Sequence, residues 1–442
     1  MALSRKYLCA GYIPPDRNKE IFMAVKIIAP KGTKDVLPSE SYKWHYVEEN
    51  IKELCALNGF NEIRTPSFEH TELFLRGVGD TTDVVQKEMY TFNDKGGRSI
   101  TLRPEGTAGV ARSFIEHGLA GGPQPVKMYY LPLSVFRYEN PQAGRLREHH
   151  QFGVEMFGAK EPSADAEVIM LALSVIKRMG INNLSLNINS IGCPKCRPAY
   201  NKSLVAYFEE HKDGLCKTCL ERLYKNPLRI LDCKEEGCKK IAAGAPLITE
   251  SLCEECEEHF SGLQELLTAA GVKFKINPYI VRGLDYYTKT VFEIISNEIG
   301  AQGTVCGGGR YDGLIHEVGG PELPGVGFGM GIERLLMVME STGAAFPAPP
   351  SPDVFIAAMG SEARIAGFKL MQSLRAEGIS CDMDHAARSL KAQFKYADKL
   401  GAKKVIVIGE DELKSGKAQL RDMANSTQSE ILLDDIVREL KK

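Results

Sequence analysis

A proline-rich segment divides the chain into two parts with different patterns of apolar residues, which we expect to form separate domains. Residues 344–352 read Ala-Ala-Phe-Pro-Ala-Pro-Pro-Ser-Pro, which predicts an extended, semi-rigid linker close to polyproline II. After the linker, strand-like runs alternate with helical runs. In chain order these runs cover residues 354–358, 362–377, 379–383, 390–400 and 404–408. Because this alternation is typical of parallel βαβ units, we expect residues 353–442 to form a separate α/β domain.

The part before the linker shows the opposite pattern, with many strand-like runs and few helices. Amphipathic helices are predicted at 39–59, with Ser39 as the N-cap, and at 163–180. Strand-like runs cover residues 60–68, 100–102, 126–136, 150–157, 184–188, 274–281 and 290–295. Consecutive strands of this kind predict an α+β domain with a mostly antiparallel sheet. Pro66 cannot donate to a strand ladder, so the first run should lie at an edge or an interface.

Residues 193–260 differ in composition and are predicted to form a small inserted module. They are rich in Cys, Lys and Glu, and they contain eight of the twelve cysteines. These form four close pairs: Cys193 with Cys196, Cys216 with Cys219, Cys233 with Cys238, and Cys253 with Cys256. Since the chain shows no secretion signal, disulfides are disfavoured, and either reduced thiols or two four-cysteine zinc sites remain. The strand-rich domain would then consist of residues 23–192 and 261–343.

Charge and hydropathy exclude some broad classes of protein. The formal net charge is -2 over 442 residues, so contacts with nucleic acid must come from local basic patches. No apolar run approaches the roughly 20 residues that cross a bilayer, and we expect no association with membranes. Residues 1–22 contain charges and prolines but no signal-peptide core, and we expect them to be a disordered extension before Met23.

Two clusters before the linker combine acids or hydroxyls with arginines. The first places Glu105 and Thr107 on a turn, where they could meet a ligand amine, although Thr107 could instead cap the next helix. The second carries Arg137 and Arg145, eight residues apart. An arginine fork binds phosphate with two hydrogen bonds. This second cluster therefore predicts either a phosphate site on a strand, a mobile loop and a returning strand, or a solvated basic hairpin.

Two further clusters are rich in tyrosine or glycine. The run 281–287 contains Arg282 and the adjacent Tyr286 and Tyr287. In a strand, neighbouring tyrosines point to opposite faces, so one could line a pocket while the other packs; an ordinary aromatic strand is the alternative. The run 327–335 has glycine at alternate positions before an apolar helix, which lets another group approach the backbone closely. It is neither a dinucleotide fingerprint nor a Walker loop.

Together, and in this order, the clusters closely resemble the motifs of the class II aminoacyl-tRNA synthetases, and within that class the histidyl-tRNA synthetases. Pro66 and the helix before it match the first motif, which forms the dimer interface in the class. Residues 137–155 match the second motif and residues 327–334 the third. The runs 282–287 and 307–312 resemble the two peptides that are particular to the histidine family. The resemblance covers the chain after about its first thirty residues.

The resemblance implies ATP-dependent attachment of L-histidine to tRNA(His) through a histidyl-adenylate, with release of AMP and pyrophosphate. Arg137 and Arg282 would flank the α-phosphate, and Arg145 and Arg334 would bind the outer phosphates together with Mg²⁺. Glu139 would bind the adenine. Arg137, Arg282 and Arg334 are the expected catalytic residues, because phosphoryl transfer depends mainly on positioning and on cancelling negative charge.

The same resemblance implies an amino-acid pocket. Its expected residues are Glu105, Thr107, Gln151, Glu155, Tyr286 and Tyr287. Glu105 and Thr107 would hold the α-amine, and Gln151 the carboxylate. A neutral imidazole has one donor and one acceptor, which Glu155 and Tyr287 could satisfy together. An apolar amino acid would leave Glu155 buried and unpaired, and would be rejected for that reason.

The resemblance also implies partners. Gln142 and Arg147 would read the acceptor end of the tRNA, whereas Asn140 stands where many relatives carry arginine, so one such contact is not carried over. Residues 353–442 resemble an anticodon-binding domain. Its local positive charge would come from Lys391, Lys395, Lys399, Lys403 and Lys404, although each of these could simply be solvated. A cytoplasmic homodimer is expected from the family.

One rival interpretation is a regulatory paralogue that binds histidine as a signal without catalysis. Such proteins tend to lose the phosphate-binding arginines and the anticodon domain. This chain keeps Arg137, Arg145, Arg282 and Arg334 and has a C-terminal domain. The sequence therefore favours the enzyme.

Overall fold

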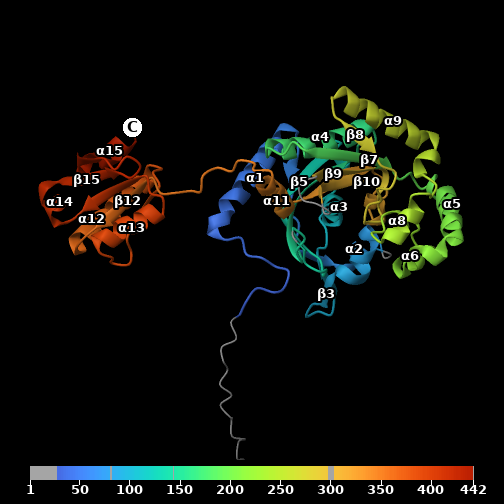
Figure 1. The fold of residues 1–442 in the computed structure, drawn as a ribbon, viewed down its shortest axis with the longest axis horizontal. Coiled ribbons are helices and arrows are strands. Elements are labelled where there is room, and N and C mark those ends of the chain that lie inside the picture. Colours follow the sequence, from blue (N-terminus) through green and yellow to red (C-terminus); the bar gives the residue numbers. More distant parts are fainter. Residues whose placement is uncertain (1–26, 80–81, 143, 297–302, 442) are drawn as a thin grey trace, which may run out of the picture. The chain divides into compact units, whose positions relative to one another are not determined.

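The computed structural model describes residues 27–79, 82–142, 144–296 and 303–441 (Figure 1). The expected extension at residues 1–22 lies outside the described residues. The chain forms two compact units, one built mainly from residues 47–345 and the other mainly from residues 346–442. None of the helices in the described ranges is long and apolar enough to cross a membrane.

An eight-stranded sheet forms the centre of the first unit, with the strand order β1-β5-β6-β11-β10-β9-β7-β8. Its strands are β1 (Asn61–Glu62), β5 (Val126–Phe136), β6 (Glu148–Phe157), β7 (Leu184–Ser190), β8 (Phe274–Ile276), β9 (Thr288–Ser296), β10 (Thr304–Arg310) and β11 (Gly325–Gly331). The inner pairings are antiparallel, and only the edge strands β1 and β8 pair in parallel. The prediction of an α+β domain with a mostly antiparallel sheet is confirmed.

Helices pack on this sheet and on a smaller one. The helix α4 (Pro162–Arg178) contacts β6, β9, β10 and β11 and is itself covered by α9 (Glu254–Ala269). The smaller sheet contains β2 (Phe68–His70), β4 (Ser99–Leu102) and β3 (Tyr90–Asn93). The other helices before the linker and outside the inserted module are α1 (Pro38–Leu57), α2 (Thr71–Val78), the π-helical turn η1 (Val84–Glu88), α3 (Thr107–Glu116), the 3-10 turn η2 (Leu119–Gly121), α10 (Leu314–Glu317) and α11 (Ile332–Ser341).

Strand β6 separates a polar surface from an apolar core. Successive side chains of a strand point to opposite faces. Phe152, Val154 and Met156 are almost completely buried on one face. Gln151 and Glu155 alternate with them and therefore point to the other face, where the candidate site lies.

A buried ion pair joins the sheet to the helices above it. Arg310, at the end of β10, has no exposed side-chain surface and donates to both carboxylate oxygens of Asp165 on α4. His259 on α9 approaches the same carboxylate at 3.4 Å. The backbone oxygens of Ala159 and Glu161 and the carboxylate of Asp312 accept the remaining donors of Arg310. Such a pair is tolerated only when its hydrogen bonds are satisfied, which fixes how α4 and α9 sit on the sheet.

The cysteine-rich module is mainly helical (Figure 1). Its short helices are α5 (Arg197–Glu210), α6 (Lys217–Arg222), α7 (Leu228–Leu231) and α8 (Glu236–Ala242), and α9 leads back to the sheet. Tyr200, Leu204 and Phe208 of α5 form the centre of a separate apolar core.

The second unit contains a five-stranded sheet in the order β13-β12-β14-β15-β16. Its elements are β12 (Val354–Ala358), α12 (Ser361–Ala376), β13 (Cys381–Met383), α13 (Leu390–Lys399), β14 (Lys404–Ile408), α14 (Glu410–Ser415), β15 (Lys417–Asp422), β16 (Gln428–Leu432) and α15 (Ile436–Leu440). The first three strands are parallel, which confirms the predicted α/β class. The last two strands are antiparallel and are missing from the prediction.

Three local predictions are wrong. The helix predicted from Ser39 begins at Pro38, so Ser39 lies inside it rather than capping it. Pro66 lies in the connection between β1 and β2 and not within a strand, because a proline cannot continue the ladder. The strand predicted over 274–281 ends at Ile276, and the following residues turn toward the site.

Candidate active site

A cavity of about 80 Å³ lies where several segments of the first unit meet. Among the residues singled out from the sequence, its lining contains Glu105, Thr107, Arg137, Gln151, Arg282, Tyr286 and Tyr287. Tyr130, Tyr311 and glycines of β10 and β11 also line it. These residues come from sequence segments up to about two hundred positions apart, and the sheet brings them together.

Glu155 is completely buried beside this cavity and accepts hydrogen bonds from three hydroxyls. Thr107 Oγ1 donates at 2.8 Å and Tyr130 OH at 3.2 Å, and Tyr311 OH donates to the other carboxylate oxygen. Burial raises the pKa of Glu155 to about 8, although the three hydroxyls oppose this shift. The site therefore holds a carboxyl group that carries a proton at neutral pH and can exchange it with a ligand.

Glu105 caps the helix α3, a role that the sequence suggested for Thr107. Its two carboxylate oxygens accept the backbone N–H groups of Thr107 at 2.7 Å and Ala108 at 2.8 Å. Burial raises the pKa of Glu105, and these two N–H groups lower it. Because Glu105 provides the cap, the hydroxyl of Thr107 points instead to Glu155.

Tyr286 and Tyr287 lie on the same side of the chain, which contradicts the prediction that they point to opposite faces. Residues 281–287 form a turn and not a strand, so strand alternation does not apply. The two ring centroids are 4.8 Å apart, and both residues line the cavity. The phenols that donate to Glu155 belong to Tyr130 and Tyr311, which the sequence analysis missed.

Both missed tyrosines lie over glycines of the sheet. A Cβ atom at Gly153 would come within 2.2 Å of the Tyr130 ring, and one at Gly327 within 2.5 Å of Tyr311 OH. Tyr311 belongs to the run 307–312 that the sequence analysis did single out, so that run was a usable signal. Tyr130 gave no such signal, because it lies within an ordinary apolar strand.

Arg282 is held against the sheet by an acid and by a glycine. It donates to Glu293 on β9, and its guanidinium lies where a Cβ atom of Gly307 would be, within 2.6 Å. Arg137 donates to the backbone oxygen of Pro104 at 2.9 Å. Both arginines reach the cavity from different segments, so positive charge lines one part of it.

Arg145 and Arg334 lie near this positive region but do not line the cavity. Arg145 pairs with Glu139 at 2.6 Å, and Arg334 donates to the backbone oxygen of Thr304 at 2.8 Å. Glu139 has a second carboxylate oxygen, Oε1, that is buried and has no hydrogen-bond partner among the residues that the structure describes. His149 lies beside these arginines, and burial together with their positive charge lowers its pKa to about 3.

The two residues assigned to tRNA recognition lie on the connection between β5 and β6. Gln142 and Arg145 exchange backbone hydrogen bonds in an isolated bridge. The guanidinium carbon of Arg147 lies 4.1 Å from the centroid of the Tyr138 ring, and its Nε donates to the backbone oxygen of Glu139. These contacts restrain the side chain of Arg147, but neither of them is with a carboxylate that would neutralise its positive charge.

The eight cysteines of the module gather into two clusters. Cys193, Cys196, Cys253 and Cys256 form the outer cluster, and Cys216, Cys219, Cys233 and Cys238 form the inner cluster. Within each cluster the sulfur atoms lie within 4.8 Å of one another. The clusters are nested, because the first pair joins the fourth and the second joins the third.

The sulfur spacing fits a tetrahedral metal site and excludes disulfides in these clusters. Measured Sγ–Sγ distances are 3.5, 3.6 and 3.8 Å in the outer cluster and 3.9 Å in the inner cluster. Four thiolates at about 2.3 Å from zinc lie about 3.8 Å apart, whereas a disulfide is about 2.05 Å long. Backbone N–H groups of Lys195, Cys253 and Cys216 donate to sulfur atoms, which favours thiolates.

Comparisons with known proteins agree on one family. The family model described as histidyl-tRNA synthetase matches residues 32–195 and 219–335, and the model described as anticodon binding domain matches residues 353–442. The gap in the first match, residues 196–218, lies inside the cysteine-rich module.

Individual proteins give the same result. The histidine–tRNA ligases of Caldanaerobacter subterraneus subsp. tengcongensis and Acetivibrio thermocellus are each 60% identical over 413 residues, covering 93% of this chain and 99% of the relative. A crystal structure of apo S. aureus histidyl-tRNA synthetase matches with a TM-score of 0.81 and 42% identity, covering 94% of this chain and all of that one.

Substitutions of two glycines in the same strand test the packing of the site. In Gly327→Ala, the new Cβ would lie 2.2 Å from the backbone oxygen of Val154 and 2.3 Å from Glu155 Oε2, so the sheet must shift. We expect a loss of about 1–3 kcal/mol in the free energy of unfolding. Gly329→Ala is the control, because its nearest neighbour, Gln151, would be 3.5 Å away. Equal denaturant midpoints for the two variants would contradict this explanation.

Proposed function

Because the chain belongs to the histidyl-tRNA synthetase family and attaches histidine to tRNA(His), we propose that the cavity beside Glu155 binds histidine and that the adjoining arginines bind ATP. The observation that carries this assignment is the surroundings of Glu155. A buried carboxyl group with hydroxyls on both oxygens, next to two arginines, suits an imidazole at one end and a reacting carboxylate at the other.

Recognition of the imidazole rests on Glu155 and the phenols around it. A neutral imidazole needs one acceptor and one donor, and the cavity offers a carboxyl group and several phenols. Tyr130 and Tyr311 keep Glu155 in place, while Tyr286 and Tyr287 provide the aromatic wall. An amino acid without a polar ring could neither accept the proton that Glu155 carries nor hydrogen-bond to the phenols, so it would bind less tightly than histidine in this cavity.

The α-amine and the carboxylate of histidine would be held at the end of the cavity opposite to the imidazole. Glu105 carries a buried carboxylate at the N-terminus of α3, which suits a ligand α-ammonium. Gln151 lines the same cavity and offers an amide N–H to the substrate carboxylate. In this position the carboxylate oxygen attacks the α-phosphorus of ATP, the bond to the β-phosphate oxygen breaks, and pyrophosphate leaves.

The arginines would stabilise the charge that develops in this step. Arg137 and Arg282 reach the cavity and would flank the α-phosphate, and Arg145 and Arg334 would bind the outer phosphates. The unpartnered buried oxygen of Glu139 suits the amino group of adenine. The second step, attack by the terminal ribose hydroxyl of the tRNA on the adenylate, uses the same site.

Magnesium would neutralise part of the triphosphate charge. Carboxylate oxygens are the protein ligands that Mg²⁺ prefers. Glu293 fits this role, because it lies beside Arg282 and its second oxygen makes only a long contact, 3.5 Å, with Thr304.

Contacts with tRNA would involve both units. Gln142 and Arg147 would meet the acceptor end from the connection between β5 and β6. The unit that begins at β12 matches the anticodon-binding model and would bind the anticodon. We place the enzyme in the cytoplasm, where charged tRNA is used. The non-catalytic regulatory alternative is not favoured, because the relatives that match over nearly their whole length are ligases.

We also propose a homodimer and the domain boundaries given by the sequence: catalytic domain at 23–192 and 261–343, module at 193–260, linker at 344–352. Exposed aromatic side chains support a partner surface near the first motif, since Phe68 is 56% and Phe92 49% exposed on the small sheet. Sedimentation of the full chain at micromolar concentration measures this directly, and a monomer there would count against the dimer.

Amino-acid-dependent exchange of pyrophosphate into ATP, without tRNA, tests the proposed function. We expect exchange with histidine and with none of the other nineteen amino acids. Arg282→Ala should lower this exchange at least ~100-fold, because one preorganised charge donor contributes about 3–4 kcal/mol to the barrier. Arg98→Ala, on an exposed turn, is the control. Tight histidine binding without any exchange would instead support the regulatory alternative.

The pH dependence of histidine affinity tests the role of Glu155. Free imidazole loses its proton near pH 6.5, at about its ordinary pKa, while Glu155 keeps its proton up to about pH 8. Between these values the complex needs the single proton that the free pocket already carries, so affinity should be flat. Affinity should weaken below this range, where imidazole must lose a proton, and above it, where the complex must take one up.

The variant Glu155→Gln separates the two limbs of this profile. It should bind histidine more weakly and lose the limb near pH 8, while the limb near pH 6.5 remains. Isothermal titration over pH 5.5–9 measures both, and an unchanged alkaline limb in the variant would contradict the assignment.

We propose that the two cysteine clusters hold structural zinc. Protein purified without chelator should contain about two zinc ions per chain by elemental mass spectrometry. A Cys233→Ser and Cys238→Ser double variant should retain one, because the outer cluster shares no ligand with the inner one. Less than one zinc per wild-type chain would contradict the two-site assignment.

A further inference from the structure

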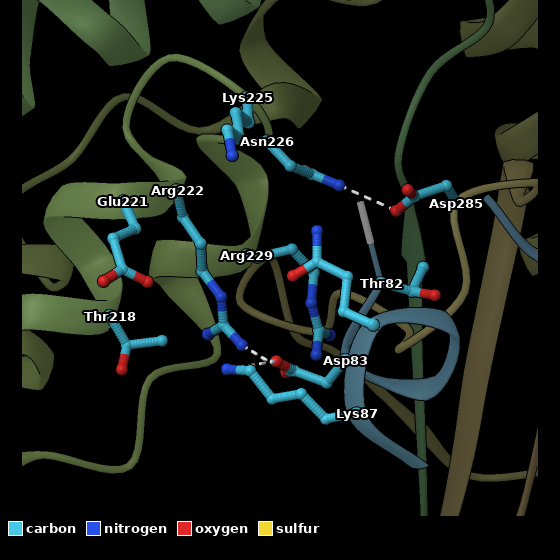
Figure 2. Close-up of a pocket in the computed structure, with 11 residues that line it drawn as sticks. Thr82, Asp83, Lys87, Thr218, Glu221, Arg222, Lys225, Asn226, Arg229 and Asp285 are labelled. Carbon is cyan, nitrogen blue, oxygen red and sulfur yellow. Dashed lines mark hydrogen bonds and ion pairs between the residues drawn. The ribbon is translucent and has the colours of Figure 1, made fainter. Parts of the chain in front are cut away.

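The inserted module meets the active-site segments around a second, polar cavity, shown in Figure 2. Its lining comes from two sources. Thr82, Asp83, Gln86 and Lys87 at η1, together with Asp285, belong to the strand-rich domain. The module contributes side chains of α6 and α7 and of the turn between them. The proposed reaction uses none of these residues.

Three side chains of the module reach across this cavity. Arg222 donates to Asp83 at 2.5 Å, and Asn226 donates to Asp285 at 2.7 Å (Figure 2). Arg229 donates to the backbone oxygen of Arg282 at 3.2 Å. We call Arg222, Asn226 and Arg229 the latch. Two of its three contacts are with the turn that carries Arg282 and the two tyrosines of the histidine cavity.

An apolar contact supports the same connection. Val281, the residue before Arg282, is 8% exposed and packs in the core of the module with residues of α5 to α8. Asp285 is in turn tied to the strand-rich domain, because its N–H donates to the backbone oxygen of Val78. The turn is therefore held from both sides, and the module provides one of them.

In the sequence, the latch residues lie between the two cysteine pairs of the inner cluster. Cys216 and Cys219 lie just before Arg222, and Cys233 and Cys238 follow Arg229. The helices between them, α6 and α7, have six and four residues. Helices this short are not stable alone, because nucleation costs more than a few hydrogen bonds return. A metal that joins the two ends of this segment would fix it.

We propose that the inner cluster is a zinc site that positions the catalytic Arg282 through the latch. The inference rests on the proposed function of Arg282 and adds a role for the module in activation of histidine. Zinc bound by the inner cluster orders α6 and α7. The latch then fixes the position of the Arg282 backbone, so that the Arg282 guanidinium reaches the cavity. The outer cluster has a different task, since it joins the two ends of the module.

The latch residues act through Arg282 and do not touch the substrates. Loss of the Arg229 hydrogen bond, which is made to Arg282 itself, should therefore lower kcat for histidine activation by a larger factor than it raises the KM for histidine. A residue that served only general stability would not separate these two constants.

The test uses full-length protein and matched variants. Arg229→Met removes the donor to the Arg282 carbonyl and keeps an apolar stem, whereas Arg229→Lys keeps a cationic donor. Lys225→Met is the control, because Lys225 is exposed and lines the same cavity, and among the described residues its side chain is not one of the donors to the turn at 281–287. The Cys233→Ser and Cys238→Ser double variant removes two ligands of the inner site.

Three measurements are made on each variant: zinc per chain, kcat and KM for histidine in pyrophosphate exchange, and hydrogen exchange of the backbone amides of residues 281–287. Arg229→Met should keep its zinc, lose about tenfold in kcat, as expected for one hydrogen bond from a charged donor, and exchange these amides faster. Arg229→Lys should recover much of the loss. The double cysteine variant should lose one zinc and show the same pattern.

Two results would overturn the proposal. One is a normal kcat together with normal amide exchange in Arg229→Met. The other is a zinc-free inner site in wild-type protein that is fully active. If the wild-type protein shows no histidine-dependent exchange, the proposed function fails, but amide exchange at 281–287 and zinc content still decide whether the metal orders this turn.

Discussion

The active site depends on the absence of side chains along the central strands. Tyr130 lies over Gly153, Tyr311 over Gly327 and Arg282 over Gly307, at distances that no Cβ atom would permit. At these glycines, large polar side chains can lie directly against the backbone of the strands. Glu155 can be buried beneath them because the phenols that donate hydrogen bonds to it are already in place. The cavity, the raised pKa of its acid and the placement of Arg282 all follow from this packing.

Two arginines of the site are already paired with acids before any substrate binds. Arg282 is paired with Glu293, and Arg145 with Glu139. A guanidinium that is fixed by a carboxylate loses little freedom when a phosphate arrives, so it can stabilise the developing charge without reorganisation. The same acids keep the region from carrying an excess of positive charge. These pairings connect the electrostatics of the site to the sheet, because Glu293 belongs to β9.

The sequence predicted those parts of the structure that local patterns determine. The strands over 126–136, 354–358 and 404–408 have the predicted bounds, because each is a continuous run of apolar or alternating residues. The segments that line the cavity were also found, since their glycines and arginines form recognisable motifs. The features that the sequence did not predict depend on contacts between distant segments. Tyr130 became a site residue only through its pairing with Gly153, Glu105 makes the cap that was an alternative role for Thr107, and the polar strands β15 and β16 are held by neighbouring strands. The nested cysteine arrangement could not be read from spacing, because close pairs permit several combinations.

The nesting of the cysteine clusters has a consequence for how such a module can be acquired. The outer cluster brings Cys193 and Cys196, directly after β7, to Cys253 and Cys256, at the start of α9. The chain therefore leaves the host sheet and returns to it at one point, and the residues between form a separate core to which Val281 of the host also contributes. An insertion whose ends lie together need not disturb the register of the sheet that receives it, since the loop is closed within the insertion itself. The demand that this module does make is on the turn at 281–287, which it contacts. Evolution can exchange, shorten or replace a segment of this kind as one cassette while the surrounding sheet keeps its register.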